Sequence, residues 1–240
     1  MKKITLAVLL FFDFFHKRKI INFIKKKIKN IEILIDVGAH HGESVKLFVN
    51  NFSIKNIYSF EPSFDNFQTL IKNTKFLQKK KNIKLELLNY ALGSLKKKLY
   101  LNVTSETSSS TINSINESSS YYKKKTKFLS NKNKKFLFKK EIIEVITLDS
   151  ALLYKKLDLI DLIKIDTEGF EYEVLKGSKE ILKKTKLVLF EHHYDNMILK
   201  NYNFRHINDF LVLNNFKKVF KAKMPFRKTF EYIYENRKKI

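Results

Sequence analysis

The chain has 240 residues, of which 44% are hydrophobic, enough for one large domain or for one domain with an added element. It contains no cysteine, which excludes disulfides, thiolate zinc sites and cysteine nucleophiles, and this fits a reducing compartment. The formal charge is +24, yet only four of the 48 basic residues are arginine, the side chain whose planar fork matches phosphate best. The charge therefore attracts anionic partners without identifying a nucleic-acid surface.

The first 30 residues predict a helical segment that precedes the main domain of residues 31–240. The start imitates a secretory signal, because two lysines are followed by an apolar run from Ile4 to Phe12. Asp13 interrupts this run, and no small-residue cleavage site follows. The run is also too short to span a bilayer. We expect a helix packed on the domain. The alternative is a helix that contacts a membrane surface through residues 1–20, with basic residues at its edge.

Residues 31–92 alternate short apolar runs with segments of helical spacing. We predict strands at 31–38, 56–63 and 82–92, and helices at 43–50 and from Pro62 to Leu77. Residues 97–103 form a further strand that we expect to pair with the third. This alternation is typical of βαβ units, in which the strands of one sheet run parallel.

Residues 104–140 interrupt the alternation with a serine-rich stretch followed by runs of lysine. A solvated surface loop is the simpler interpretation. The functional interpretation is a lid or acceptor-binding loop near the ligand edge of the sheet. Aromatic residues between the lysines suit an anionic or nucleic-acid acceptor; they are Tyr121, Tyr122, Phe128, Phe136 and Phe138.

The alternation resumes after this insertion. Asp149 is the predicted N-cap of a short helix, and Gly177 locally interrupts a later one. The predicted strands are 142–148, 161–166 and 186–193, the helices are 149–157, 170–184 and 204–214, and residues 217–223 and 229–236 form a closing antiparallel pair.

Acidic residues and glycines end the first two predicted strands. IDVGAHHG places Asp36, Gly38 and Gly42 at a strand-to-helix turn, where glycines let the chain bend and expose amide groups at a helix N-terminus. The dinucleotide pattern G-x-G-x-x-G is absent, because Asp36 stands where its first glycine would be, and an acid there suits a ligand with a cationic group. Glu61 ends the second strand, where a carboxylate can hydrogen-bond both hydroxyls of a ribose. Together the two turns indicate an adenosine-type ligand.

Several stretches extend this pattern: IDVGAHHGES, SFEPS, NYALG, VITLDSALL and, most specifically, IDLIKIDTEGFEYEVLKG followed by LVLFEHH. Through them residues 31–193 resemble the S-adenosylmethionine-dependent methyltransferases of FkbM type. The resemblance implies an α/β fold with a doubly wound, mostly parallel seven-stranded sheet, helices on both faces and the last strand antiparallel. It also implies O-methyl transfer, often to sugar or other secondary hydroxyls.

The resemblance further implies roles for individual residues. The cofactor, S-adenosylmethionine, would be bound by Asp36, Gly38 and Gly42 on its methionine side, by Glu61 at its ribose, and by Asn89 and Ala91 in the turn beside its adenine. A serine pair usually follows the third strand in the family, and Ser108, Ser109 and Ser110 occupy about that place. The departures are residues 121–140 and the double histidine His40-His41, which bear on the acceptor rather than on the cofactor.

Asp166 and Glu168 follow a buried strand, at the edge where open α/β sheets bind ligands. With His192 they are the predicted catalytic residues, because transfer to a hydroxyl needs in-line approach and a group that accepts the hydroxyl proton. Glu191, His192 and His193 end the next strand and project toward the same edge. Since strand side chains alternate, the two histidines cannot both point into the site.

These residues also have structural interpretations. Asp166 and Glu168 suit helix capping, and His192 suits a packed or edge histidine. Glu171 and Glu173 are expected to stabilise the first turn of the following helix and to pair with lysines. The oxygen and nitrogen atoms of the acids and the histidine would also suit a divalent metal, but we predict none.

The sequence therefore predicts a methyltransferase that uses S-adenosylmethionine to methylate a hydroxyl of a sugar, glycan or similar small acceptor. The alternative within the same fold is an RNA or DNA acceptor, against which the few arginines and the lack of an N/D-P-P-Y motif count. The alternative from another class is a non-catalytic module associated with a membrane. The expected location is the cytoplasm. The alternative is a cytoplasmic protein that is peripherally attached to a membrane.

Overall fold

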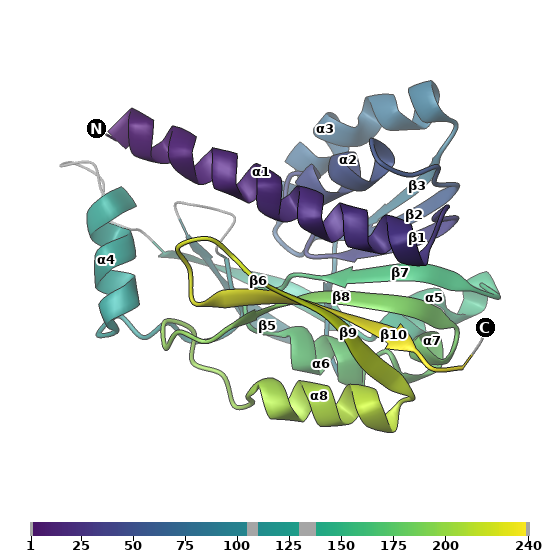
Figure 1. Ribbon diagram of the computed structural model, residues 1–240. Coiled ribbons are helices and arrows are strands. Elements are labelled where there is room, and N and C mark those ends of the chain that lie inside the picture. Colours follow the sequence, from purple (N-terminus) through teal and green to yellow (C-terminus); the bar gives the residue numbers. More distant parts are fainter. Residues whose placement is uncertain (1, 105–109, 130–137, 239–240) are drawn as a thin grey trace.

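The computed structural model describes residues 2–104, 110–129 and 138–238 (Figure 1). A seven-stranded sheet forms its centre, in the order β3-β2-β1-β7-β8-β10-β9. Its strands are β1 Ile33–Val37, β2 Asn56–Phe60, β3 Lys84–Leu88, β7 Ile160–Ile165, β8 Thr185–His193, β9 Phe216–Lys223 and β10 Thr229–Asn236. The first five in spatial order run parallel, whereas β10 is antiparallel to both of its neighbours. The predicted fold class, with the last strand antiparallel, is confirmed.

Helices cover both faces of this sheet. On one face lie α1 Lys2–Lys27, α2 Glu43–Val49 and α3 Phe64–Lys81, and on the other lie α5 Leu148–Leu152, the short 3₁₀ helix η2 Leu153–Lys155, α6 Glu171–Lys176, α7 Lys179–Lys183 and α8 Phe204–Leu213. The central strands β1, β2, β7 and β8 are buried on both sides, because helices cover both faces and successive side chains point to opposite faces. Leu34, for example, belongs to the core cluster under α1 and α2, and Ile35 to the cluster under α6 and α8.

A second, three-stranded sheet corrects the predicted pairing of residues 97–103. Strand β5 Lys97–Thr104 is antiparallel to β6 Phe138–Ile146, which also pairs with the short β4 Ala91–Leu92. The predicted strand 82–92 is therefore two strands in two sheets. Asn89 lies between them, and its side-chain amide donates to the carbonyl oxygens of Glu61 and Pro62 at 2.8 and 3.0 Å, which ties the end of β3 to the end of β2.

The insertion contains more regular structure than the sequence indicated. It holds helix α4 Ser120–Leu129, and Thr111 and Ile115 form isolated bridges with Asn102 and Ile198. The predicted acceptor residue Phe136 and the serines Ser108 and Ser109 lie outside the described residues.

Asp149 does not cap its own helix. Thr147 is the N-cap of α5 and accepts a hydrogen bond from the amide of Ser150 at 2.9 Å. The carboxylate of Asp149 instead accepts from the amides of Glu180 and Ile181, at 3.1 and 2.9 Å, at the start of α7. Asp149 therefore joins two helices, because an acid at a helix N-terminus satisfies amides that have no partner within the helix.

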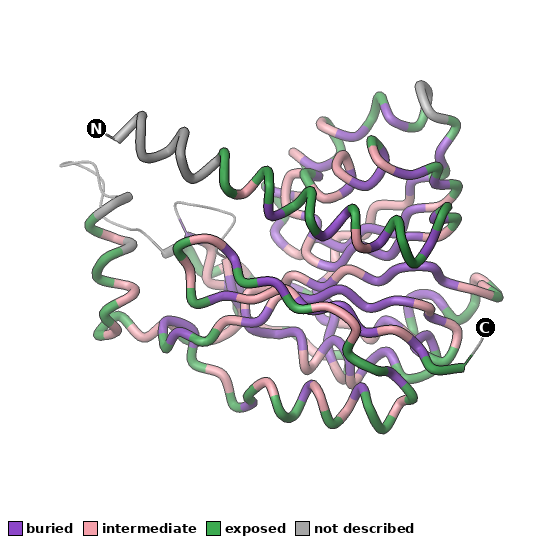
Figure 2. Tube along the Cα trace, viewed as in Figure 1, coloured by how far each residue is buried: buried purple, intermediate pink, exposed green. Residues whose placement is uncertain are grey.

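Helix α1 packs into the core of the domain through its C-terminal half. Ile20, Ile21, Ile24 and Ile28 are buried in the core cluster of that face, and His16 contacts Glu231 of β10. The N-terminal half projects beyond the sheet, and residues 11, 12, 14 and 15 are exposed whereas Asp13 is half-buried (Figure 2). None of the described helices is long and apolar enough to cross a membrane.

Candidate active site

The ends of β1 and β7 meet at Gly38. The backbone φ of Gly38 is +80°, and a Cβ added to this residue would lie 1.9 Å from the carbonyl oxygen of Asp166. Only glycine permits both this conformation and this close approach. The turn continues to Gly42, at φ +88°, which is the N-cap of α2. The amides of Gly38 and Ala39 both donate to the carbonyl oxygen of Phe60, each at 3.0 Å, so that the turn lies directly beside the end of β2.

A buried lysine neutralises the acids at this edge. The Nζ of Lys164 lies 3.3 Å from Asp36 and 3.4 Å from Asp166, and it donates to the carbonyl oxygen of Gly38 at 3.2 Å. Burial opposes the charge of Lys164, but Asp36 and Asp166 more than offset this and raise its pKa. Asp36 is fully buried and also accepts from the hydroxyl of Ser44 at 2.5 Å. The cation that faces Asp36 in this structure is therefore the protein's own lysine.

Glu61 is oriented by backbone amides at the end of β2. Its carboxylate accepts from the amides of His40 and Ser63 at 2.8 and 3.0 Å and from the side-chain amide of Asn66 at 3.4 Å. Burial raises the pKa of Glu61 despite these donors. A pocket lies beside this residue, lined by Pro62, Phe64, Asn89, Tyr90 and residues 141–144. The predicted adenine residue Asn89 is thus at the pocket, whereas Ala91 is buried in β4 and is not among the pocket residues.

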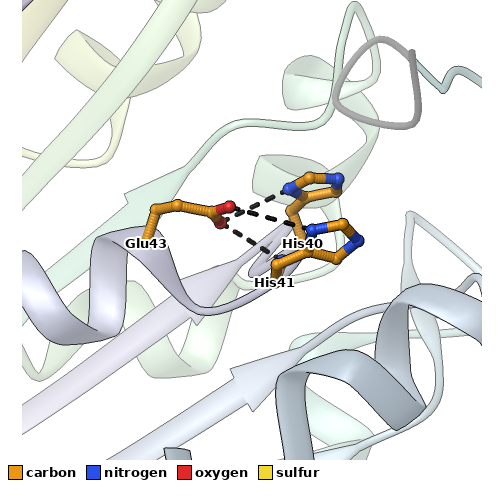
Figure 3. A group of neighbouring side chains, drawn as sticks. All are labelled: His40, His41 and Glu43. Atoms are coloured by element: carbon orange, nitrogen blue, oxygen red, sulfur yellow. Dashed lines mark hydrogen bonds and ion pairs between the residues drawn. The ribbon is translucent and has the colours of Figure 1, made fainter. Parts of the chain in front are cut away.

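His40 and His41 stack on each other in the glycine turn, with ring centroids 3.7 Å apart (Figure 3). The Nδ1 of His40 is 3.3 Å from Glu43, the first residue of α2, and the Nδ1 of His41 is 3.9 Å from it. Burial works against ionisation of Glu43, but hydrogen bonds and the histidine charges lower its pKa to about 2. The ligand atoms of these three residues lie within 4.8 Å of one another, so they could hold a metal ion.

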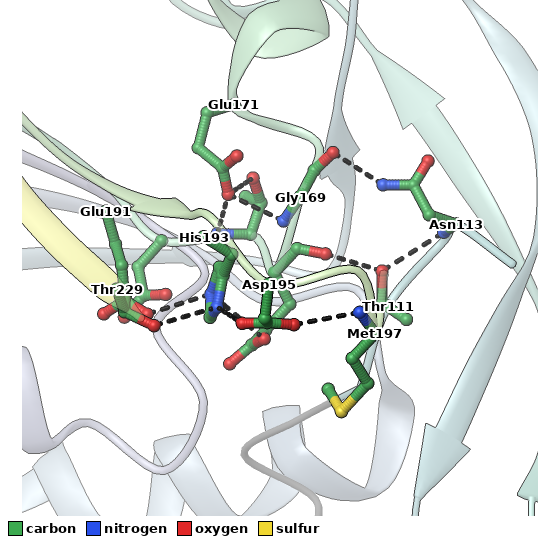
Figure 4. A network of polar contacts seen from close by, with 12 residues as sticks. Thr111, Asn113, Gly169, Glu171, Glu191, His193, Asp195, Met197 and Thr229 are labelled. Atoms are coloured by element: carbon green, nitrogen blue, oxygen red, sulfur yellow. Dashed lines mark hydrogen bonds and ion pairs between the residues drawn. The ribbon is translucent and has the colours of Figure 1, made fainter. Parts of the chain in front are cut away.

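A second cluster lies at the ends of β7 and β8, and Figure 4 shows the contacts around it. The Nε2 of His193 lies 2.9 Å from Glu191 and 3.4 Å from Glu168. These side chains are 10–17% exposed, and the Nε2 makes no hydrogen bond of good geometry. On the other side of the ring, Nδ1 contacts the hydroxyl of Thr229 at 3.2 Å and Asp195 at 3.7 Å. Glu168, Glu191 and His193 also form a set of ligands that could hold a divalent cation.

The prediction that His192 lies with the acids is corrected to His193. Glu191 and His193 are two residues apart on β8 and share a face of the sheet, while His192 points to the other face. There it is 2% exposed and packs against the rings of Tyr194, Tyr202 and Phe204. Burial lowers the pKa of His192 to about 3, which makes it a packed, neutral histidine.

Protons in this cluster are held more tightly than in free side chains. Burial, together with the negative charge of Asp166, raises the pKa of Glu191 to about 8. Burial would lower the pKa of His193, but Glu168, Asp195 and Glu191 outweigh it and raise this pKa well above its usual value. At neutral pH the cluster therefore retains at least one proton between Glu191 and His193.

Glu171 has a role that the sequence interpretation missed. It is fully buried rather than paired with a lysine, and its Oε1 accepts from the amide of Gly169 at 2.8 Å and from the amide of Thr167 at 3.3 Å. Its Oε2 accepts from the hydroxyl of Tyr202 at 2.5 Å. These bonds fix the loop in which Glu168 adopts a left-handed φ of 48°, an uncommon conformation for a residue with a side chain. Glu173 does pair with a lysine, Lys176.

The insertion contacts the same loop from the opposite side. The hydroxyl of Thr111 donates to the carbonyl oxygen of Glu168 at 2.6 Å. The side-chain amide of Asn113 donates to the carbonyl oxygen of Gly169, also at 2.6 Å. In helix α4, burial and the charge of Asp195 raise the pKa of Tyr121, so this ring lies near the cluster. Thr111, Asn113 and Tyr121 of the insertion thus lie close to the loop of Glu168 or to the cluster.

Comparisons with known proteins agree with this fold. A family model described as the methyltransferase FkbM domain matches residues 36–220. A methyltransferase FkbM structure from Methylobacillus flagellatus KT superposes with a TM-score of 0.57 at 15% identity, covering 86% of this chain but only 43% of that one. Magnesium protoporphyrin IX methyltransferase from Synechocystis PCC 6803, solved with bound S-adenosylmethionine, superposes with a TM-score of 0.51 at 7% identity. The match covers 92% of this chain and 77% of that one. No curated protein matches the chain.

Proposed function

The chain belongs to the FkbM methyltransferase family, whose cofactor is S-adenosylmethionine, and we propose that it methylates a hydroxyl of a sugar, a glycan or a similar small acceptor. The cofactor supplies an electrophilic methyl group on a sulfonium. The observation that carries the proposal is the cluster of Glu168, Glu191 and His193 at the carboxyl ends of β7 and β8. A hydroxyl must lose its proton when it attacks, and a carboxylate–imidazole group at the ligand edge of the sheet can accept it.

The cofactor side of the site rests on the first two strand ends. The turn from Gly38 to Gly42 would lie against the methionine part, because it follows the carboxyl end of β1 at the ligand edge of the sheet. Glu61, already aligned by two amides, would accept hydrogen bonds from the ribose hydroxyls, and the pocket beside Asn89 and Tyr90 would take the adenine. Asp36 acts through Lys164, which holds the ends of β1 and β7 together.

The reaction that we propose is a direct displacement. The acceptor oxygen forms a bond to the methyl carbon as the bond from carbon to sulfur breaks, and the hydroxyl proton passes to the cluster. Glu168 is the most exposed of the three side chains and is held in position by the loop around Glu171, so it would contact the acceptor hydroxyl. Asp166 lies on the same loop beside Lys164 and would contribute through its charge.

The test is methyl transfer from S-adenosylmethionine to a pool of sugars and glycans, followed by mass spectrometry for an added methyl group. We expect Glu168→Gln and His193→Asn to lower kcat by about 10²- to 10⁴-fold, the usual contribution of a general base. Glu180→Gln, an exposed glutamate on α7, is the matched control and should retain full activity. Calorimetry should show that all of these variants still bind S-adenosylhomocysteine, whereas Glu61→Ala should not.

Two outcomes would contradict the proposal. If the wild type does not bind S-adenosylhomocysteine, or binds it no better than Glu61→Ala does, the cofactor site is wrong. If methyl transfer is unchanged in Glu168→Gln and His193→Asn, the cluster is not the proton acceptor. A loss of activity in EDTA that Mn²⁺ or Mg²⁺ restores would instead assign the cluster to metal binding, which its donor set allows.

A further inference from the structure

We infer that the chain has a docking surface for anionic phospholipid bilayers, formed by residues 11–19 of α1 and by the hairpin between β9 and β10. Its centre is an aromatic patch of five phenylalanines. Their exposed fractions are 58% for Phe11, 41% for Phe12, 59% for Phe14, 49% for Phe15 and 69% for Phe226. Exposed apolar clusters of this kind mark interaction surfaces on soluble proteins.

Two distant parts of the chain are held together to form the aromatic patch. The rings of Phe12 and Phe226 meet edge to face with centroids 5.2 Å apart, and Asp13 pairs with Arg227 at 3.4 Å. Phe226 adopts a left-handed φ of 60° at the hairpin turn, an unfavourable conformation for a bulky residue. In Figure 1 this turn lies on the same side of the sheet as the N-terminal half of α1.

The shape of the aromatic patch favours a membrane interface over a groove in a partner protein. Residues 11, 12, 14 and 15 cover about 160° of the helix circumference at about 100° per residue. This is a broad apolar face near the middle of α1, and such faces insert among lipid headgroups. The negative charge of Asp13 would disfavour insertion, but this carboxylate is paired with Arg227.

Charge complementarity identifies the lipid as anionic. The next turn of α1 carries the exposed residues Lys17, Arg18 and Lys19, and the hairpin carries the exposed Lys223 and Lys228. A groove between α1 and β9 combines both chemistries, since it is lined by three phenylalanines, Phe15, Phe23 and Phe220, together with Arg18, Lys19, Asn22 and Lys26. An apolar floor with a cationic rim suits a phospholipid with a negative headgroup.

The hairpin also connects this surface with the catalytic edge. The amide of Tyr194, next to His193, donates to the carbonyl oxygen of Lys228 at 2.7 Å, and Thr229 contacts His193 directly. A bilayer bound at Phe226 would therefore lie two to three residues along the chain from the residues that hold the catalytic histidine.

Flotation of the purified full chain with phosphatidylcholine vesicles, with and without phosphatidylglycerol, tests the inference. We expect flotation with the anionic vesicles only. The triple variant Phe11→Ser, Phe14→Ser, Phe226→Ser keeps the net charge. Its binding to the vesicles should be at least about tenfold weaker than that of the wild type. The control triple variant Phe76→Ser, Leu95→Ser, Leu213→Ser removes three residues that are also exposed, 51%, 53% and 83%, and should bind like the wild type.

A second pair of variants separates local from overall charge. Lys17→Gln, Arg18→Gln, Lys19→Gln should weaken flotation more than Lys55→Gln, Lys72→Gln, Lys75→Gln, which removes the same charge elsewhere on the surface. Thermal unfolding and binding of S-adenosylhomocysteine should be unchanged in every variant, because none of these residues lies in the core or in the cofactor site.

Several results would overturn the inference. They are no flotation of the wild type, equal flotation of the wild type and the aromatic variant, and equal losses in the two charge variants. A dimer in sedimentation that the aromatic variant abolishes, without any flotation, would assign the surface to a second copy of the chain. Each of these readouts is independent of the acceptor, so they remain informative if the proposed hydroxyl methylation fails.

Discussion

His192 and His193 are neighbours in the sequence but have opposite protonation behaviour in the fold. Burial among aromatic rings lowers the pKa of His192, whereas surrounding carboxylates raise that of His193. A period of two along β8 places Glu191 with His193, and this signal is present in the sequence. Which of the two faces turns toward the ligand edge depends on the packing of β8 between β7 and β10, and no local pattern records it.

The raised pKa of Glu191 leads to a prediction about pH. Because the cluster can accept a further proton only after Glu191 has lost its own, we expect kcat/KM to rise about tenfold per pH unit below pH 8 and to level off above it. The Glu191→Gln variant should lack this rise or show it at another pH. The measurement is a profile of kcat/KM from pH 6 to 9.5 in buffers of constant ionic strength. A flat wild-type profile, or an identical rise in the variant, would show that this proton does not control the rate.

At the scale of elements, the loop between β7 and α6 depends on Glu171. Glu171→Ala would leave the amides of Thr167 and Gly169 and the hydroxyl of Tyr202 without their acceptor. We expect the free energy of unfolding to fall by about 2–4 kcal/mol, as for buried polar groups that lose their partner, and kcat to fall because Glu168 loses its position. Glu180→Ala, which removes an exposed pair with Lys183, should cost less than about 1 kcal/mol. Urea denaturation and kcat check both. Similar effects of the two substitutions would show that Glu171 does not hold the loop.

Most elements of the large sheet could be predicted from the sequence because each ends in a local signal. Gly38 follows β1, Glu61 follows β2 and the acidic loop follows β7, and the apolar runs before them give strands buried on both faces. The second sheet could not be predicted, since β5 pairs with β6 across the insertion. The capping role of Asp149 was also hidden, because its partners Glu180 and Ile181 lie about 30 residues away.

At the scale of the whole molecule, the charge of +24 predicts binding to nucleic acid without catalysis. Lysines spread over the surface attract phosphates as point charges, and such binding depends steeply on salt. We expect affinity for a random RNA oligonucleotide to fall at least about tenfold between 50 and 200 mM salt, with no methyl transfer to it. Filter binding and incorporation of a labelled methyl group measure the two quantities. Methyl incorporation into RNA at a rate above that with glycans would favour the nucleic-acid alternative.

The position of β10 affects how the chain folds during synthesis. Of the strands in this sheet, β10 comes last in the sequence, yet it lies between β8 and β9. Until residue 236 has emerged, β8 has an open edge and β9 lacks the strand with which it pairs. Open edges of this kind are sites of mispairing between chains. Nascent chains that stall before this point would therefore expose two unpaired strands at once, so the sheet is completed only after all of its other strands have been made.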